Sequence, residues 1–395
     1  MRFRLLVQQT LLLLLISLLG GCLTHSVDSR HGEEKEIVNI PDDPGEYPPY
    51  RVVVGYTPSW RGDVADIDYE KLTHINYAFH MTDSVGNIVP TWSPDGLEGD
   101  HDLRLQKLVN FAHQKDVHVL LAIGGATDRN FGRFAVHADL RQNFYKEIKR
   151  VVQQYNLDGI DIDWEYPETT EQGEAFEALM LGVRKTLDQL DSNLLLTVAV
   201  GASTYGTSYI SAKAVEPCDW INIMTYDFTG GWASSGVGPT APMSFAISGC
   251  ELWKEKGVSF SRMALGIPFY GIRFAMNGKN RVEAAQMSYS NLDRAFDLNR
   301  IIAADTLFLD TFVVKRVTLP DSTFRYDTLD VDRIYYYWDT PQLVGEKTVY
   351  ALSKRMRGVM IWELSQDVVT DSLSLLHSIW DEMQEVMPEV QKREQ

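Results

Sequence analysis

Eight short apolar runs, separated by longer amphipathic stretches, constrain the fold of this chain more than any other feature of its sequence. The runs are rich in Val, Ile and Leu and span residues 51–56, 74–79, 118–123, 159–163, 194–200, 220–224, 263–268 and 358–362. Apolar residues recur with a helical period at 103–116, 140–155, 170–190 and 341–356. Strands that alternate with helices predict parallel β/α units, and eight such units fit a closed (β/α)8 TIM barrel.

A doubly wound open sheet is the alternative arrangement of these units. It usually carries a glycine-rich phosphate loop after its first strand, and the segment after Val54 has none. The connection between the seventh run and the last helix is too long for a simple βα loop and contains β-prone segments. We therefore predict a small inserted subdomain at 272–340, between strands 7 and 8, with the barrel formed by residues 50–271 and 341–390.

The start of the chain has the composition of an export signal. Two arginines precede an apolar run over residues 11–19, which is too short to span a bilayer as a stable helix. The sequence Leu19-Gly20-Gly21-Cys22 follows and resembles a bacterial lipoprotein signal, so residues 1–21 are predicted to be a signal peptide and Cys22 its lipidated residue. A plain secretory signal with an incidental cysteine is the alternative. Residues 22–49 are polar and charged, which predicts a tether.

The formal net charge of −17 at pH 7 limits the partners of this protein. Nucleic acid and an anionic membrane surface would both repel such a chain, so we expect contact with a membrane only through a lipid anchor. We expect an exported monomer. Cys218 and Cys250 remain after the predicted signal, either as one disulfide or as two buried thiols. No Cys/His cluster has metal-ligand spacing, and we expect neither a metal nor a cofactor.

The fourth apolar run carries a row of acidic residues within the sequence Asp158-Gly-Ile-Asp-Ile-Asp-Trp-Glu-Tyr-Pro. Because side chains alternate along a strand, Asp161, Asp163 and Glu165 share one face and the apolar residues between them share the other. In a closed barrel the three carboxylates face the interior, which is costly unless they are paired, hydrogen-bonded or protonated. An exposed edge strand is the alternative, although the other seven runs are nearly all apolar.

This row also predicts acid catalysis. Stacked like charges disfavour simultaneous ionisation, so the pKa of at least one member should rise. A carboxyl that keeps its proton near neutral pH serves as a general acid. Glu165 is the last of the three, at the carboxyl end of its strand, where barrel active sites lie. We therefore predict that Glu165 is the proton donor and that Asp163 and Asp161 tune and orient it.

The pattern Asp158-Gly-x-Asp-x-Asp-x-Glu165 resembles the signature of family 18 glycoside hydrolases, the chitinases. The resemblance covers nearly the whole chain after Pro49. Further similar motifs are residues 121–125 for the third strand, 224–227 with Gly231-Trp232 for the sixth, and 358–362 for the eighth, with Trp164 and Tyr166-Pro167 resembling chitinases proper.

The resemblance implies a retaining hydrolase of β-1,4-linked N-acetylglucosamine oligo- or polysaccharides, in which the substrate's own 2-acetamido oxygen is the nucleophile. Glu165 would protonate the leaving oxygen. Asp163 would hold the acetamido N–H and share a proton with Asp161, while Tyr226 would donate a hydrogen bond to the acetamido carbonyl. The other residues implied to bind substrate are Tyr56, Phe79, Gly124, Gly125, Tyr166, Met224, Asp227, Trp232 and Trp362, the last of these as the floor under the sugar.

Two departures from the family pattern affect the leaving side. Ala126 stands where many chitinases carry a Trp platform, and Ile272 follows Tyr270-Gly271 where an Arg is frequent, with Arg273 one place along. They leave room for an endo-β-N-acetylglucosaminidase that acts on N-glycans. A non-catalytic chitin-binding lectin is the alternative from a different class of function.

The lipid anchor gives the first testable prediction. Cys22→Ala removes the thiol that directly follows the predicted cleavage site and would carry the lipid, so the protein should move from the membrane fraction to the soluble fraction. Fractionation followed by immunoblotting measures this shift. An unchanged distribution would show that the motif around Cys22 does not anchor the chain.

Overall fold

The computed structural model describes residue 48 and residues 50–91, 100–296, 306–308, 312–318, 324–331, 333–369 and 372–384. The predicted signal peptide and Cys22 lie outside these residues, as does nearly all of the predicted tether. Within the described part of the chain, no helix is both long enough and apolar enough to cross a bilayer.

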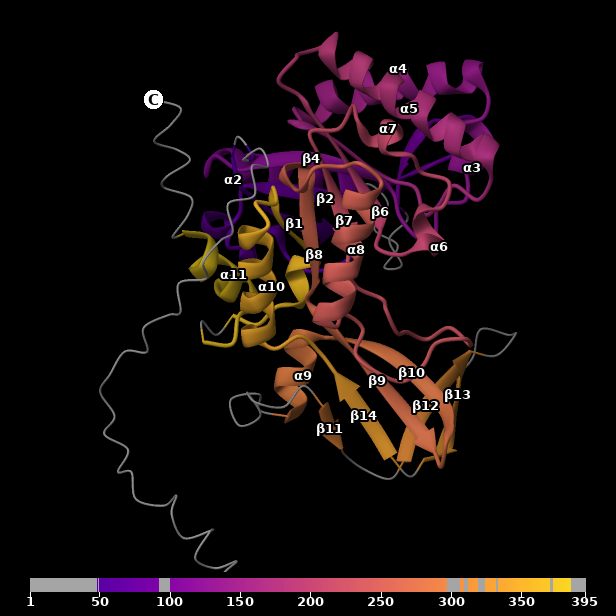
Figure 1. Ribbon diagram of the computed structural model, residues 1–395, viewed down its shortest axis with the longest axis vertical. Coiled ribbons are helices and arrows are strands. Elements are labelled where there is room, and N and C mark those ends of the chain that lie inside the picture. The colour runs from indigo at the N-terminus through magenta and orange to yellow at the C-terminus, as the bar shows by residue number, and fades with distance from the viewer. Residues whose placement is uncertain are drawn as a thin grey trace, which may run out of the picture. The chain divides into compact units, whose positions relative to one another are not determined.

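Eight parallel strands close into a barrel (Figure 1). Their bounds are β1 Val52–Pro58, β2 His74–Thr82, β4 His118–Gly124, β5 Gly159–Asp163, β6 Leu195–Gly201, β7 Trp220–Met224, β8 Met263–Pro268 and β15 Gly358–Trp362. Neighbours follow the order β1-β15-β8-β7-β6-β5-β4-β2, and β2 pairs again with β1, which closes the sheet. The predicted TIM barrel is confirmed, and the open-sheet alternative is wrong.

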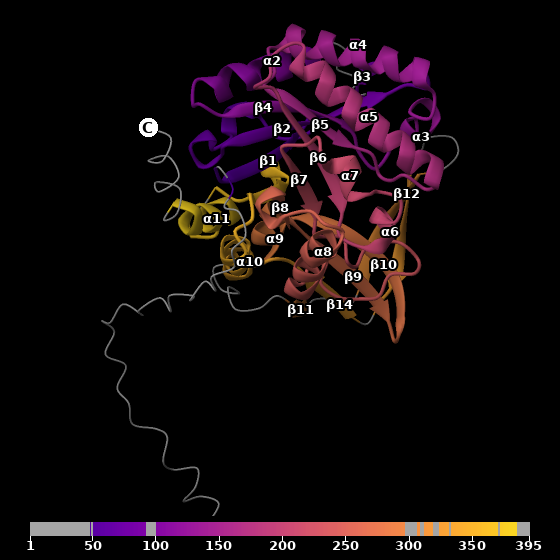
Figure 2. The same ribbon diagram turned by 45° about the horizontal axis from the view of Figure 1, so that its top comes forward.

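Helices cover the outside of this barrel (Figure 2). The long ones are α2 Asp100–His113, α4 Ala138–Tyr155, α5 Thr170–Asp188, α8 Met243–Glu255, α10 Pro341–Ser353 and α11 Leu375–Gln384. Shorter elements are α3 Phe131–Phe134, α6 Thr204–Thr207, α7 Ala212–Val215, the strand β3 Ile88–Pro90, and the 3-10 turns Val64–Asp66, Tyr69–Lys71, Phe260–Arg262 and Leu364–Gln366. The helix α2 begins and ends three residues before the helix predicted at 103–116.

Capping residues in the local sequence determine where two of these helices begin. The Thr169 hydroxyl accepts a hydrogen bond from the Gln172 backbone N–H at the start of α5. Thr340 does the same for the Leu343 N–H at the start of α10, and Pro341 occupies the first turn, where no N–H is needed. These caps fix where the chain turns from a loop at the barrel mouth into an outer helix.

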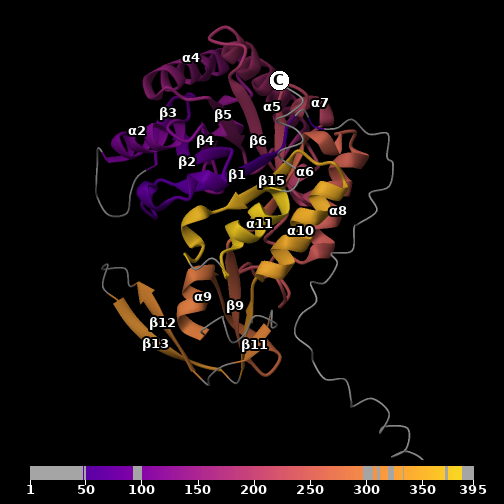
Figure 3. The same cartoon turned by 90° about the vertical axis from the view of Figure 1, so that its left-hand side faces the viewer.

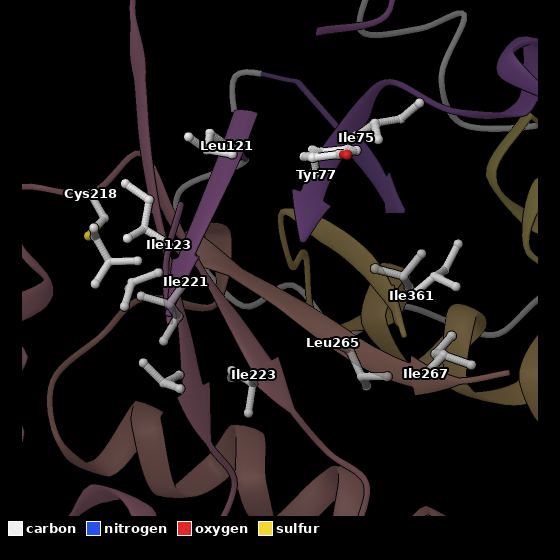
Figure 4. Close-up of a cluster of buried hydrophobic side chains, with 14 of the residues drawn as sticks. Ile75, Tyr77, Leu121, Ile123, Cys218, Ile221, Ile223, Leu265, Ile267 and Ile361 are labelled. Atoms are coloured by element: carbon white, nitrogen blue, oxygen red, sulfur yellow. The ribbon is translucent and has the colours of Figure 1, made fainter. Parts of the chain in front are cut away.

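Each barrel strand has two buried faces. The outward faces pack under the helices in one large apolar cluster, part of which Figure 4 shows: Ile75, Tyr77, Leu121, Ile123, Cys218, Ile221, Ile223, Leu265, Ile267 and Ile361. The inward faces form a second, smaller cluster that includes Tyr56, Ala122, Trp220 and Met360. Cys218 and Cys250 are buried free thiols, and burial raises the pKa of Cys250 to about 12. Of the two alternatives, the structure has the unpaired thiols.

An inserted subdomain lies between β8 and β15 in the chain (Figure 3). Its antiparallel sheet has the order β10-β9-β14-β11, and β12 and β13 form a separate hairpin. The bounds are β9 Tyr270–Asn277, β10 Asn280–Ser288, α9 Tyr289–Phe296, β11 Thr306–Phe308, β12 Phe312–Thr318, β13 Phe324–Asp330 and β14 Arg333–Tyr337. The first strand of this sheet begins at Tyr270, so it follows β8 after a single residue.

A buried ion pair fixes the point where the chain returns from the insertion to the barrel. The Lys347 ammonium on α10 donates to the Asp339 carboxylate, just after β14, and to the Ala241 carbonyl at 2.6 Å. The Lys347 side chain is fully buried and that of Asp339 is nearly so. The loop that contains Ala241, 106 residues earlier in the chain, therefore meets the end of the insertion at one charge, and the Asp339 carboxylate and the Ala241 carbonyl would both be left unpaired if that charge were removed.

Lys347→Met should strongly destabilise the protein, because it leaves the Asp339 carboxylate buried without its partner. The expected loss is about 3–5 kcal/mol of the free energy of unfolding, measured by urea denaturation. The double variant Lys347→Met/Asp339→Leu removes both charges and should recover most of that loss. A single variant as stable as the wild type would show that the pair does not hold these segments.

Candidate active site

The strand β5 points its acidic residues into the barrel. Asp161 and Asp163 are buried, while Glu165 lies just beyond the end of the strand and is partly exposed. Trp164, between the last two, points outward and stacks on Phe131 with ring centroids 5.5 Å apart. The alternation of side chains along one strand thus places the three carboxyl groups in a row that rises from the barrel interior to its mouth.

Asp161, the deepest of the three, is hydrogen-bonded on both oxygens. Its Oδ2 accepts from the Tyr56 hydroxyl at 2.6 Å, and its Oδ1 accepts from Thr197 Oγ1 at 2.5 Å and Asn222 Nδ2 at 3.1 Å. Burial raises the pKa of Asp161 to about 6, and these donors oppose that rise. Tyr56, which we had placed in the pocket lining, therefore also anchors the base of the carboxylate row.

Asp163 differs because its Oδ1 has no hydrogen-bond partner among the described residues although it is buried. Burial raises its pKa well above the usual range, and the neighbouring Glu165 and Asp161 carboxylates raise it further. Gly124 lets β4 approach closely here, since a Cβ at its φ of +123° would lie 2.1 Å from the Asp163 carbonyl oxygen. Asp163 thus keeps unused capacity to accept a hydrogen bond from a ligand.

Glu165 has the properties of a general acid. Burial raises its pKa to about 7, and the nearby Asp227 carboxylate adds to the rise. A hydrogen bond from Tyr166 and the charge of Arg129 lower the pKa and partly offset these effects. Glu165 therefore holds its proton up to about pH 7, as a proton donor to a leaving group requires.

Tyr226 and Asp227 follow β7 at the same edge of the barrel. The Tyr226 hydroxyl contacts Met360 Sδ at 3.8 Å, which is a weak acceptor, so this O–H is also available to a ligand. Asp227 Oδ1 accepts hydrogen bonds from Tyr270 at 2.6 Å and from Gln286 at 3.4 Å, both in the insertion. The inserted subdomain thereby helps to position a residue of the barrel site.

Aromatic rings form one wall of the site. Trp362 stacks on Phe79 with ring centroids 5.6 Å apart and lies 5.6 Å from the Tyr56 ring. Trp60 continues this series, 6.2 Å from Phe79. We did not predict Trp60 from the sequence, although its position two residues after β1, at the same edge as Glu165, was a usable signal.

A cavity of about 510 Å³ opens among these groups. Of the predicted residues, its lining includes Tyr56, Phe79, Gly124, Asp163, Glu165, Met224, Tyr226, Asp227 and Trp362; it adds Trp60, Met81, Thr91, Ala126, Thr127, Ala199 and Gln286. Asp161, Gly125, Tyr166 and Trp232 do not line it. Asp161 lies below the cavity, and Gly125 packs against the Phe79 ring, where a Cβ would come within 2.7 Å.

Two residues near the insertion lie away from the cavity. Trp232 is 45% exposed and folds over Gly230, in a loop whose carbonyls accept hydrogen bonds from Arg281. Arg273 pairs with Glu283 inside the insertion and does not line the cavity. It therefore does not substitute for the pocket arginine that the family pattern led us to consider.

The described residues contain no group of three His, Cys, Asp or Glu side chains that could hold a metal ion. What the site offers instead is a row of carboxyl groups with raised pKa values at the carboxyl edge of a (β/α)8 barrel, beside stacked aromatic rings. Such a site suits proton transfer to a sugar leaving group, the chemistry of a glycoside hydrolase.

Sequence comparison identifies the family. Residues 52–367 match the profile of Glycosyl hydrolases family 18, and the chain belongs to this family. Chitinase A1 of Niallia circulans is 29% identical over 399 residues, which cover 80% of this chain and 56% of that protein. The chain thus spans little more than half the length of this relative.

Solved structures share the fold. Catalytic domain 2 of the Group II chitinase from Ostrinia furnacalis superposes with a TM-score of 0.68 at 22% identity, covering 85% of this chain and 97% of that chain. A chitinase-like agglutinin from Robinia pseudoacacia gives a TM-score of 0.67 at 24% identity, covering 83% and 98%. One fold therefore accompanies both a chitinase and an agglutinin, so function must be argued from the site itself.

The pKa of Glu165 predicts the pH profile of the reaction. Since the acid must carry its proton, kcat/KM should fall above about pH 7, by tenfold for each further pH unit. Asp227→Asn removes a charge that raises this pKa and should move the midpoint to lower pH; Arg129→Gln removes a charge that lowers it and should move the midpoint upward. If both variants moved the midpoint in the same direction, or if neither moved it, the assignment of Glu165 as the acid would be contradicted.

Proposed function

We propose that this protein is a retaining hydrolase of β-1,4-linked N-acetylglucosamine chains, and that the 2-acetamido group of the substrate is the nucleophile. One observation carries the proposal: Asp163 and Tyr226 line the same cavity, where Asp163 Oδ1 is an acceptor without a partner among the described residues and the Tyr226 hydroxyl is a donor whose recorded acceptor is a weak one, Met360 Sδ. An acetamido group needs this pair, because its N–H donates and its carbonyl oxygen accepts. The chitinase names of the relatives support the substrate class.

The reaction would proceed in two steps. In the first, Glu165 gives its proton to the glycosidic oxygen, the bond from that oxygen to C1 breaks, and the acetamido carbonyl oxygen bonds to C1 from the opposite face. Asp163 accepts the acetamido N–H and offsets the positive charge of the cyclic intermediate. In the second step, Glu165 takes a proton from a water molecule whose oxygen bonds to C1, the bond from C1 to the acetamido oxygen breaks, and the original configuration is restored.

The carboxylate row is better suited to this scheme than to direct attack by a protein carboxylate. Asp161 has both oxygens engaged by Tyr56, Thr197 and Asn222, below the cavity. Asp163 is the remaining candidate, and in this scheme its free oxygen, Oδ1, is engaged by the acetamido N–H. An internal nucleophile supplied by the substrate removes the need for a second exposed carboxylate.

A lectin is the alternative, and the agglutinin with the same fold is the reason to weigh it. A protein that only binds sugar has no need of a proton donor. Here Glu165 lines the cavity and its pKa is raised to about 7, which favours catalysis over binding alone. An endo-acting enzyme on N-glycans would use the same acid and the same acetamido contacts, and it differs only in the glycan accepted beyond them.

We further propose that the enzyme is exported and held at a bacterial membrane through a lipid on Cys22. The support is the sequence alone: the short apolar run at 11–19, the Leu19-Gly20-Gly21-Cys22 motif, and the polar segment that follows. Such a tether would let the catalytic barrel reach soluble glycans near the membrane surface.

The decisive experiment compares chitotetraose with its fully deacetylated counterpart, reading products by mass. The acetylated substrate should be cleaved and the deacetylated one should not, because it lacks the nucleophilic oxygen. Glu165→Gln is the matched variant; it keeps the shape of the side chain and should lower kcat by at least ~10²-fold. Cleavage of the deacetylated chain at a comparable rate would overturn the acetamido mechanism, and an unaffected Glu165→Gln would overturn the role of the acid.

A further inference from the structure

A second recess adjoins the catalytic cavity. It measures about 570 Å³ and shares two lining residues with the cavity, Ala126 and Glu165. The loops after β4, β5 and β6 supply its other walls: Arg129, Tyr166, Pro167, Glu168, Tyr205, Ser208 and Tyr209. None of these residues has a step in the reaction described above.

The geometry of the proposed reaction makes this recess the leaving-group side of the site. Glu165 gives its proton to the oxygen that joins the scissile sugar to the leaving group, so the leaving group lies past Glu165. The scissile sugar occupies the cavity beside Asp163 and Trp362. At the junction Ala126 contributes only a methyl group, which leaves the recess open to a chain that continues from the cavity.

The recess contains a positively charged side chain, whereas the described lining of the catalytic cavity contains none. Among the described residues that line the cavity or the recess, Arg129 is the one cation. Its side chain is exposed, and no carboxylate in the described part of the chain lies within ion-pair distance of it. Glu168 is the opposing charge in the recess, and Glu165, whose pKa is about 7, adds a negative charge only as the pH rises above that value.

The tyrosines provide flat surfaces beside this cation. Tyr205 is 88% exposed and meets the Tyr166 ring edge-on, with centroids 6.2 Å apart. Tyr209 is 44% exposed on the same wall. Exposed tyrosines present an apolar ring together with a hydroxyl, a combination that suits the face and the hydroxyl groups of a sugar.

We propose that this recess selects a leaving group that carries a carboxylate, with Arg129 as the residue that binds it. A neutral N-acetylglucosamine chain offers no charge to a free guanidinium, whereas a carboxylate matches its fork of donors in a bidentate contact. The inference rests on the proposed function, since it defines the leaving side by the position of the acid. It deepens that function by naming the acidic class of glycan that the enzyme prefers.

The test uses chito-oligosaccharides whose reducing end is either oxidised to the aldonate or reduced to the alditol, from the tetramer to the hexamer. The two forms share every scissile bond and differ in one carboxylate. At low ionic strength the wild type should favour the aldonate of at least one length by about fivefold in kcat/KM, the upper range for an exposed ion pair. Because each ratio compares two substrates of one enzyme, any effect of Arg129 on the pKa of Glu165 cancels.

Two variants make the test specific. Arg129→Gln should abolish the preference for the aldonate, and Arg129→Lys should retain part of it as a point charge. Glu168→Gln removes the opposing charge from the same recess and should increase the preference. A preference that persists in Arg129→Gln would overturn the role of Arg129.

The remaining outcomes separate this inference from the proposed function. Equal kcat/KM for aldonate and alditol at every length would overturn the carboxylate preference and leave the hydrolase activity standing. Failure to cleave either form would overturn the proposed function, and the inference with it. A further pair of substrates carries a lactyl ether on alternate sugars, either as the carboxylate or as its amide. Comparing the two distinguishes an internal acidic sugar from an oxidised chain end as the source of the charge. Preference for either acid supports the proposal.

Discussion

The burial of three acidic side chains on one strand inside a closed barrel is the constraint on which the rest of the site depends. Burial is the largest cause of the raised pKa of Asp161, Asp163 and Glu165 alike. The deepest carboxyl is tolerated because donors from three other strands, Tyr56, Thr197 and Asn222, surround it. The barrel cross-section is thus built around one acidic group, and Asp163, above it, is buried beside further carboxyl groups.

The inserted subdomain belongs to the site as well as to the fold. Tyr270 and Gln286 hold Asp227, whose charge raises the pKa of Glu165, and Arg281 holds the loop that carries Trp232. An element that is separate in the sequence therefore acts on the acid through Asp227.

Residue patterns predicted much of the fold and of the site, and the features that they did not predict have a physical explanation. Apolar runs separated by amphipathic stretches predicted the barrel strands, and the period-two alternation of side chains placed the carboxyl groups on one face. It also explains Arg273: neighbours on β9 point to opposite faces, so Ile272 packs into the apolar cluster of the insertion while Arg273 pairs with Glu283. Gln286 could not be found, because its role depends on where an antiparallel strand of the insertion meets a barrel loop.

The sequence by itself determined the barrel, through the alternation of strands and helices along the chain, and the carboxylate row, through spacing along one strand; it also predicted Glu165 as the acid. Only the tertiary structure decided which groups keep free hydrogen-bonding capacity, how far each carboxyl group is buried, and that Arg129 lies beside a tyrosine-lined recess past Glu165. Those properties arise from side chains brought together by strands and loops distant in the chain. Desolvation and charge act through space, and the linear order of residues does not specify those distances.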